Sequence, residues 1–136
     1  MVLVDTSIWS LSIRRDEVNL NSREQKLRSE LAELIREGRA RIISSIRQEL
    51  LSGIRDQSKF ELVRTRMRAL SDEQLSEKDF EEAARVSNLL RSKGISASPI
   101  DCLICAVALK QGYAIFSADE DFRHYARHLP ITMHAC

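Results

Sequence analysis

The amino-acid sequence predicts an α/β protein in which helices cover both faces of a mostly parallel β-sheet. Short apolar segments alternate with longer segments of helical periodicity, in the order strand, helices, strand, helices, strand, helix, strand. The first apolar segment, residues 2–4, shows no alternation of polar and apolar positions, as expected of a central strand covered on both faces. Right-handed crossover connections between parallel strands are the default. An open sheet with helices on each side is therefore the expected architecture.

After this strand, the first half of the chain contains an amphipathic helix and a second strand. Residues 22–37 place their leucines on one face, and Gly38 supplies the signal that ends this helix. Residues 41–43 then read as the second strand. Ser45 and the glutamine three positions later form a capping-box pattern, which predicts that the next helix begins at Ile46.

Three further helices are predicted in the middle of the chain. One covers residues 57–69, and another is capped by Ser76 and ends at Gly94. The third has Ser98 as its N-cap and Pro99 at its first helical position. Eight consecutive apolar residues later in this third helix leave it no polar face, so we expect it to lie in the interior.

The C-terminal part returns to short strands. Gly112 ends the interior helix, and residues 113–116 form the next predicted strand. A short basic helix is expected up to about residue 127, before a last strand at residues 131–133.

The overall composition predicts one domain, residues 1–136, of ordinary globular character. The net charge of +1 neither indicates nor excludes a nucleic-acid partner, so any support must come from local basic patches. No apolar run approaches the roughly 18–20 residues of a membrane helix, and the N-terminus lacks the pattern of a signal peptide. The three cysteines fit a reducing compartment. We therefore expect a cytoplasmic protein that does not span a membrane.

Four acidic side chains are expected near one edge of the predicted sheet. Asp5 and Asp119 follow predicted strands, while Glu49 and Asp101 lie near predicted helix N-termini, and ligands of open α/β sheets bind at the carboxyl ends of the strands. Each acid alone could instead cap a helix or turn, or stay exposed. If the acids converge, two like charges 4 Å apart repel by about 4 kcal/mol at an effective dielectric near 20. A hard divalent cation such as Mg²⁺ or Mn²⁺ would remove that repulsion.

The residues around these acids resemble the PIN-domain family, and within it the VapC-type toxins of toxin–antitoxin pairs. The resemblance rests on four segments in order, residues 4–9, 46–50, 98–108 and 117–122. It implies a three-layer α/β/α fold with a four- or five-stranded parallel sheet. It also implies a Mg²⁺- or Mn²⁺-dependent endoribonuclease that cleaves transfer or ribosomal RNA. Such a protein usually dimerises, and a partner antitoxin neutralises it by covering the active site.

The resemblance also assigns roles to the acids. Asp5, Glu49 and Asp101 are expected to bind the principal cation, and Asp119 to complete the site by its position in the fourth motif. Asp121 competes with Asp119 for that role, and is otherwise a helper or a surface residue. The cation would activate a water for in-line attack on the phosphodiester.

Nearby hydroxyl and guanidinium groups are candidates for supporting roles. Thr6 or Ser7 could orient Asp5 or a water, and Ser117 could do the same for Asp119. The arginines could hold the RNA backbone with a salt-dependent affinity. The alternative for the arginines is an ordinary solvated surface. The hydroxyl candidates are Thr6, Ser7 and Ser117, and the arginine candidates are Arg14, Arg15, Arg47 and Arg123.

Two other classes of protein compete with a nuclease. A PIN-like module that only binds RNA or acts as a scaffold would typically lack one of the four acids, and here all four are present. A phosphotransfer protein would need either paired acids after its first strand with a late lysine, or an Asp-x-Asp motif. Asp5 is followed by Thr-Ser, and Lys110 lies inside a predicted helix, so the phosphotransfer class fits poorly.

Overall fold

The sheet has the predicted parallel arrangement. The computed structural model describes residues 1–13, 15 and 17–136. Within them, the strands form one sheet in the order β2-β1-β3-β4, and each neighbouring pair is parallel. The strands are β1 (Val2–Val4), β2 (Ala40–Arg41), β3 (Ala114–Phe116) and β4 (Thr132–Met133).

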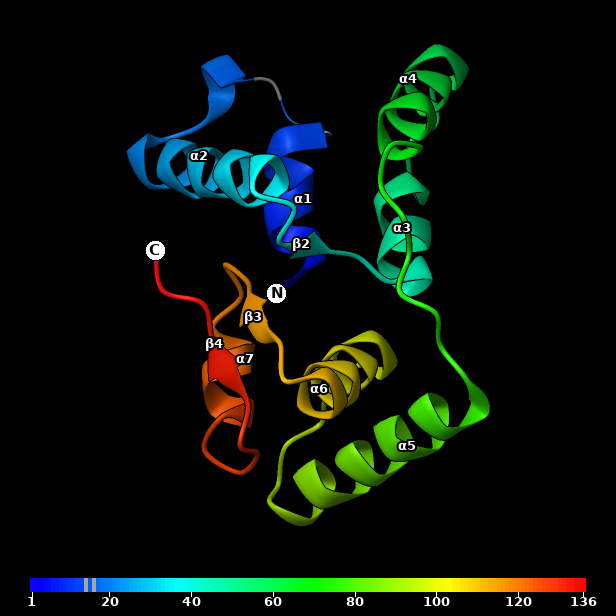
Figure 1. Ribbon diagram of the computed structural model, residues 1–136, viewed down its shortest axis with the longest axis vertical. Coiled ribbons are helices and arrows are strands. Elements are labelled where there is room, and N and C mark those ends of the chain that lie inside the picture. The colour runs from blue at the N-terminus through cyan, green and yellow to red at the C-terminus, as the bar shows by residue number, and fades with distance from the viewer. Residues whose placement is uncertain (14, 16) are drawn as a thin grey trace.

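Helices lie on both sides of this sheet. In Figure 1, α1 and α2 lie on one side of the strands and α5 and α6 on the other, while α3 and α4 lie beyond the end near β2. The expected three-layer α/β/α fold is therefore confirmed. The helices are α1 (Thr6–Ile13), η1 (Glu17–Asn19, a 3-10 helix), α2 (Ser22–Arg36), α3 (Ser44–Leu51), α4 (Gln57–Met67), α5 (Glu77–Ser92), α6 (Pro99–Gln111) and α7 (Asp121–Tyr125).

The helix α6 is the interior helix that the sequence predicts. The Ser98 hydroxyl accepts a hydrogen bond from the backbone N–H of Asp101, and Pro99 occupies the first turn. All seven residues 102–108 are buried, so α6 forms much of the core together with the buried strand β1. Gly112 ends the helix in the left-handed conformation, with φ 71°, where a side chain would be strained.

The helix α1 is absent from the expectations drawn from the sequence. It contains four threonine or serine residues and two isoleucines, all of which have weak intrinsic helix propensity, and it shows no clear polar face. Tertiary burial stabilises it instead, because Ile8 and Trp9 are fully buried. The carbonyl of Asp5 accepts from the backbone N–H groups of both residues, and the Trp9 indole donates to the carbonyl of Val4 at 2.9 Å.

The second strand is shorter and earlier than expected. The expected strand covered residues 41–43, whereas β2 ends at Arg41. Ile42 makes a separate parallel bridge to Asp72. The chain between α4 and α5 therefore takes the place of a longer strand at this edge of the sheet.

The helix α3 begins two residues before its expected start at Ile46. Its N-cap is Ile43, which forms no side-chain cap, and the predicted capping box from Ser45 is not made. The carbonyl of Ile43 accepts the first helical hydrogen bond, from the Ile46 N–H at 3.0 Å. Ser44 donates its hydroxyl to Asp72 at 2.6 Å, so a tertiary contact fixes the start of this helix.

The remaining predicted elements differ only at their ends. The helix α4 ends at Met67 rather than at residue 69, and α7 ends at Tyr125 rather than near residue 127. The capping box of α5, between Ser76 and Asp79, is formed as predicted. Across the described residues, no helix combines the length and the apolar character that a bilayer crossing requires.

Candidate functional site

The candidate site lies where β1 and β3 end side by side. The Asp5 N–H, directly after β1, donates to the carbonyl of Phe116 at the end of β3, at 2.9 Å. Asp119 follows β3 by three residues, and Asp121 opens α7. Asp101 lies in the first turn of α6. The ends of β1 and β3 and the N-termini of α6 and α7 thus bring acidic side chains to the carboxyl edge of the sheet.

Three of these aspartates form a tight group. Asp101, Asp119 and Asp121 each present an oxygen that lies within 4.8 Å of the other two. Asp5 lies close enough for its charge to raise the pKa of Asp101. The sequence left open whether Asp119 or Asp121 belongs to the site, and the structure places both there. Asp119 also accepts a hydrogen bond from the Asp121 N–H at 2.9 Å, but the N-cap of α7 is Glu120, so the alternative that Asp119 is the N-cap of this helix is wrong.

The carboxylate of Asp5 is held by two serine hydroxyls. Ser7 and Ser117 each donate to its Oδ2 atom at 2.8 Å. We expected Ser117 to orient the Asp119 carboxylate, but its hydroxyl is directed at Asp5 and accepts only the backbone N–H of Asp119. Thr6 supports Asp5 through its backbone N–H. Among the described residues, the buried Thr6 hydroxyl has no hydrogen-bond partner.

Asp101 is held by a residue that the sequence analysis did not identify. The Tyr125 hydroxyl donates to Asp101 Oδ2 at 2.6 Å. Tyr125 is only 3% exposed. Burial, together with the hydrogen bond to the Asp101 carboxylate, raises the pKa of the Tyr125 phenol, so it stays a proton donor. One signal was available in the sequence, because Tyr125 lies four residues after Asp121 and residues with that spacing share a helix face.

Within the part of the chain that the structure describes, the acids gather without a basic ion-pair partner. Burial raises the pKa of Asp5, and the hydrogen bonds from Ser117 and Ser7 only partly oppose that rise. Burial also raises the pKa of Asp101, and the nearby charges of Asp5 and Asp119 raise it further. None of the ion pairs that the described residues form involves an acid of the site. These acids are Asp5, Asp101, Asp119 and Asp121. The site therefore concentrates negative charge that a cation would neutralise.

The raised pKa values of Asp5 and Asp101 predict how the stability of the cation-free protein depends on pH. Because each folded-state pKa lies above the unfolded-state value, the folded state binds more protons in the window between the two. The stability contributed by these groups is therefore present at low pH and is lost as the pH rises through that window. We expect Asp101→Asn to raise the Tm in EDTA more at pH 7.5 than at pH 4. An equal or larger gain at pH 4, measured by thermal unfolding, would contradict this.

Glu49, the remaining predicted acid, lies beside the group rather than within it. It is exposed in the second turn of α3. It lines a pocket of about 490 Å³ together with Ser98 and Pro99 at the start of α6. Among the described residues, the acids whose oxygens lie within 4.8 Å of one another do not include Glu49. It therefore faces the N-terminal end of the helix that carries Asp101.

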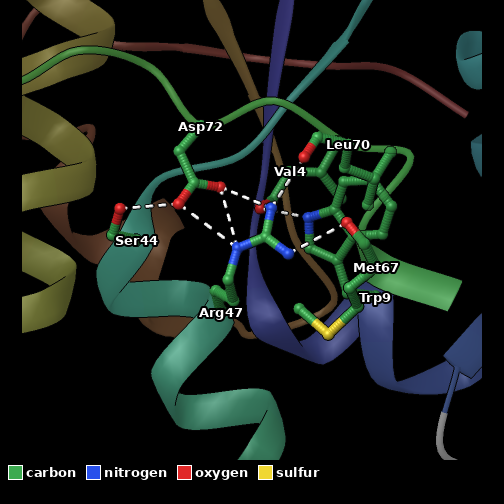
Figure 2. Close-up of polar contacts among 7 residues, drawn as sticks. All are labelled: Val4, Trp9, Ser44, Arg47, Met67, Leu70 and Asp72. Atoms are coloured by element: carbon green, nitrogen blue, oxygen red, sulfur yellow. Dashed lines mark hydrogen bonds and ion pairs between the residues drawn. The ribbon is translucent and has the colours of Figure 1, made fainter. Parts of the chain in front are cut away.

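The Arg47 guanidinium is bound within the protein rather than open to solvent. Figure 2 shows its guanidinium held by Asp72 and by the main-chain carbonyls of Met67 and Leu70. The shortest contact to Asp72 is 2.6 Å, and both side chains are about three-quarters buried. Burial would raise the pKa of Asp72, but hydrogen bonds from Arg47 and Ser44 outweigh it and lower that pKa. This corrects the expectation that Arg47 is available to the RNA backbone.

The other predicted arginines differ in their accessibility. Arg15 pairs with Glu24 and also donates to the carbonyl of Asn19. It lines a pocket of about 340 Å³ that also includes Ser7 of the site. Arg123 is largely exposed and pairs with Glu120 at 3.4 Å. Arg14 lies outside the described residues.

The fold and the acids at the carboxyl edge of its sheet define a class of protein. It is an α/β/α protein whose cluster of carboxylates is suited to hard divalent cations and phosphodiester chemistry. The chain belongs to the PIN domain family, whose family model matches residues 2–128. It is 30% identical to the VapC ribonuclease Mb1587 of Mycobacterium bovis, over 93% of this chain and 92% of the relative. It shares the same identity and coverage with the ribonuclease VapC11 of Mycobacterium tuberculosis.

Solved structures share the fold at lower sequence identity. FitAcB from Neisseria gonorrhoeae has a TM-score of 0.75 at 17% identity, over 99% of this chain and 97% of that one. VapBC2 from Rickettsia felis, solved with a DNA fragment from its promoter, has a TM-score of 0.72 at 16% identity over 98% of both chains. These likenesses place the whole described chain in one known fold.

Proposed function

We propose that this protein is a divalent-cation-dependent endoribonuclease and the toxin of a toxin–antitoxin pair. The observation that carries the proposal is the meeting of Asp5, Asp101, Asp119 and Asp121 at one sheet edge, with no ion pair among the described residues to balance them. The ribonuclease names of relatives that are 30% identical over nearly the whole chain support the same activity.

The donor atoms suit Mg²⁺ or Mn²⁺. Every candidate ligand is a carboxylate oxygen, which is the donor these hard cations prefer. Cys105 lies near, but burial raises the pKa of its thiol far above neutral, so it stays protonated and is a poor ligand. We assign the cation to Asp5, Asp101, Asp119 and Asp121, with Glu49 at the neighbouring pocket able to complete the set. When bound, the cation would supply Lewis-acid activation of water and would neutralise charge on the phosphoryl oxygens.

The residues of the chain provide orientation and binding. Ser7 and Ser117 fix Asp5, so this carboxylate meets the cation without a large rearrangement. The exposed Arg123 beside the site would hold the RNA backbone, as would Arg15 near Ser7 if it exchanges Glu24 for phosphate. The protein thus brings a phosphodiester against the acidic edge through flanking phosphates.

An antitoxin and a second toxin copy are the proposed protein partners. Apolar side chains that remain exposed offer surface to such partners: Val18, Ile35, Leu62, Phe80 and Leu89 are each at least 41% exposed. The toxin–antitoxin resemblance of the sequence and the VapBC structural likeness support this pairing. We place the activity in the cytoplasm, where transfer and ribosomal RNA are available.

The proposal predicts that added Mn²⁺ or Mg²⁺ stabilises the folded protein. A cation that binds only the folded state adds about 2.7 kcal/mol of stability at 100 times its dissociation constant. The measurement is the Tm of EDTA-treated protein as MnCl₂ or MgCl₂ is titrated, with NaCl and KCl at matched ionic strength as controls. A Tm that does not respond to Mn²⁺ or Mg²⁺ would contradict the cation site.

Activity is tested with structured RNA. EDTA-treated protein is incubated with 5′-labelled transfer RNA or a ribosomal RNA stem-loop, with and without Mg²⁺ or Mn²⁺. We expect discrete cleavage products that appear only with the cation. Binding of RNA without any cleavage under these conditions would favour a catalytically silent RNA-binding module instead.

A further inference from the structure

The hydrogen bond between Tyr125 and Asp101 joins two elements that are otherwise separate in the sequence. Tyr125 is the last residue of α7, and Asp101 lies in the first turn of α6. The donor and acceptor oxygens are 2.6 Å apart, which is the short distance typical of a hydroxyl that donates to a charged carboxylate. The contact therefore ties α7 directly to one of the acids of the group.

The position of Tyr125 is itself well fixed. Its ring is buried and packs edge-on against Phe122, with centroids 5.2 Å apart and an interplanar angle of 76°. Phe122 has no exposed surface. Asp121 lies one helical turn before Tyr125 on the same face. The short helix α7, anchored by its buried aromatic side chains, thus presents the Asp121 carboxylate and the Tyr125 hydroxyl to Asp101.

Asp101 needs such a restraint more than a surface acid does. Neighbouring negative charges on Asp5 and Asp119 disfavour its carboxylate in this place. Two serine hydroxyls hold the Oδ2 atom of Asp5. On Asp101 the Oδ2 atom receives the Tyr125 hydroxyl, and the Ser98 hydroxyl is the other side-chain hydrogen-bond partner of this carboxyl. Asp101 is also only partly buried, so water can hydrate its carboxylate in orientations other than the one observed. Without the Tyr125 hydroxyl, the carboxylate would lose its short hydrogen bond at Oδ2 and could turn away from its acidic neighbours.

We infer that Tyr125 is a positioning residue, which holds the Asp101 carboxylate facing Asp119 and Asp121 so that the group is ready to bind a divalent cation. This inference rests on the cation site of the proposed function. Tyr125 does not itself touch the cation or the RNA in this account. Its hydroxyl lowers the cost of assembling the ligands, because the orientation of Asp101 is set before the cation arrives.

The test is the affinity of the protein for Mn²⁺, measured by calorimetry or by the electron paramagnetic resonance signal of free Mn²⁺. Tyr125→Phe removes only the hydroxyl and keeps the ring packed against Phe122. We expect the Mn²⁺ dissociation constant to rise roughly tenfold or more, as is typical when a partner that orients a metal ligand is lost. This readout needs no RNA and no catalytic turnover.

Tyr113 offers a matched control in the same chain. Its hydroxyl also donates to a carboxylate, Glu73 Oε1, at 3.0 Å, but it lies just before β3, at the opposite end of that strand from Ser117. Tyr113→Phe makes the same chemical change away from the site. We expect it to leave the Mn²⁺ dissociation constant within about twofold of wild type. Whatever thermal stability either variant loses in EDTA, only Tyr125→Phe should lose cation affinity.

The outcomes separate this inference from the proposed function. If wild type binds Mn²⁺ and Tyr125→Phe binds it equally well, Tyr125 has only a structural role and the inference is wrong while the cation site stands. If wild type does not bind Mn²⁺, the proposed function itself fails. An equal loss of affinity in Tyr113→Phe and Tyr125→Phe would also overturn the inference, because the effect would then come from general destabilisation.

Discussion

Replacing Asp101 by asparagine is expected to lower the rate of RNA cleavage at least about 100-fold, and Asp5→Asn should have a similar effect. Asparagine keeps the size of the side chain and one carbonyl oxygen but removes the negative charge that a cation requires. A catalytic cation stabilises the transition state by several kcal/mol, and each 1.36 kcal/mol corresponds to a factor of ten in rate. The measurement is the initial rate of cleavage of a labelled RNA at saturating Mg²⁺ or Mn²⁺.

Glu120→Gln is the control for these two variants. Glu120 lies between Asp119 and Asp121, yet it is about 60% exposed and pairs with Arg123. Removing its charge should leave the cleavage rate within about twofold of wild type. The assignment of the acids is wrong if Asp101→Asn and Asp5→Asn retain wild-type rates, or if Glu120→Gln loses as much activity as they do.

Arg47→Ala is expected to lower the free energy of unfolding by about 2–4 kcal/mol without a change in the KM for RNA. The substitution leaves the partly buried Asp72 carboxylate and the carbonyls of Met67 and Leu70 without their guanidinium donors (Figure 2). Asp72 also receives the Ser44 hydroxyl at the start of α3, so the loss should loosen the contact of α3 with the chain after α4. Chemical unfolding and steady-state kinetics of the folded variant measure the two quantities.

Arg123→Ala should show the opposite pattern. Arg123 is largely exposed and its ion pair with Glu120 is a surface contact, so its loss should change stability by no more than about 0.5 kcal/mol. The KM for RNA should rise, and more at low salt than at high salt. If Arg47→Ala raises KM while leaving stability intact, Arg47 contacts RNA after all and its structural assignment is wrong.

Much of the fold could be predicted because its signals are local. The Ser98 and Pro99 start, the apolar run and the Gly112 stop defined α6 without knowledge of any other element. The helix α1 could not be predicted in this way, because burial of Ile8 and Trp9 stabilises it rather than propensity or an amphipathic pattern. The start of α3 was misplaced for a related reason, since its position depends on tertiary contacts of Ser44 and Arg47 with Asp72.

The positions of Asp5, Asp101 and Asp119 near the carboxyl edge of the sheet could be predicted from strand ends and a helix start, whereas Glu49 lies outside the group of neighbouring acids and Asp121 was left open. The contacts that orient the acids could not be predicted, because they form between elements far apart in the chain. Ser117 lies two residues from Asp119, yet its hydroxyl is directed at Asp5, 112 positions away. Tyr125 donates to Asp101 from 24 positions away, and no residue near Asp101 in the sequence indicates this contact.

The most direct test of the cation site is the location of Mn²⁺ in a crystal of the protein. Anomalous diffraction from a crystal soaked in MnCl₂ should show a peak about 2.0–2.5 Å from an oxygen of Asp101, with further ligands from Asp5, Asp119 or Asp121. A peak at another surface, or no peak at these aspartates with millimolar Mn²⁺ present, would contradict the account.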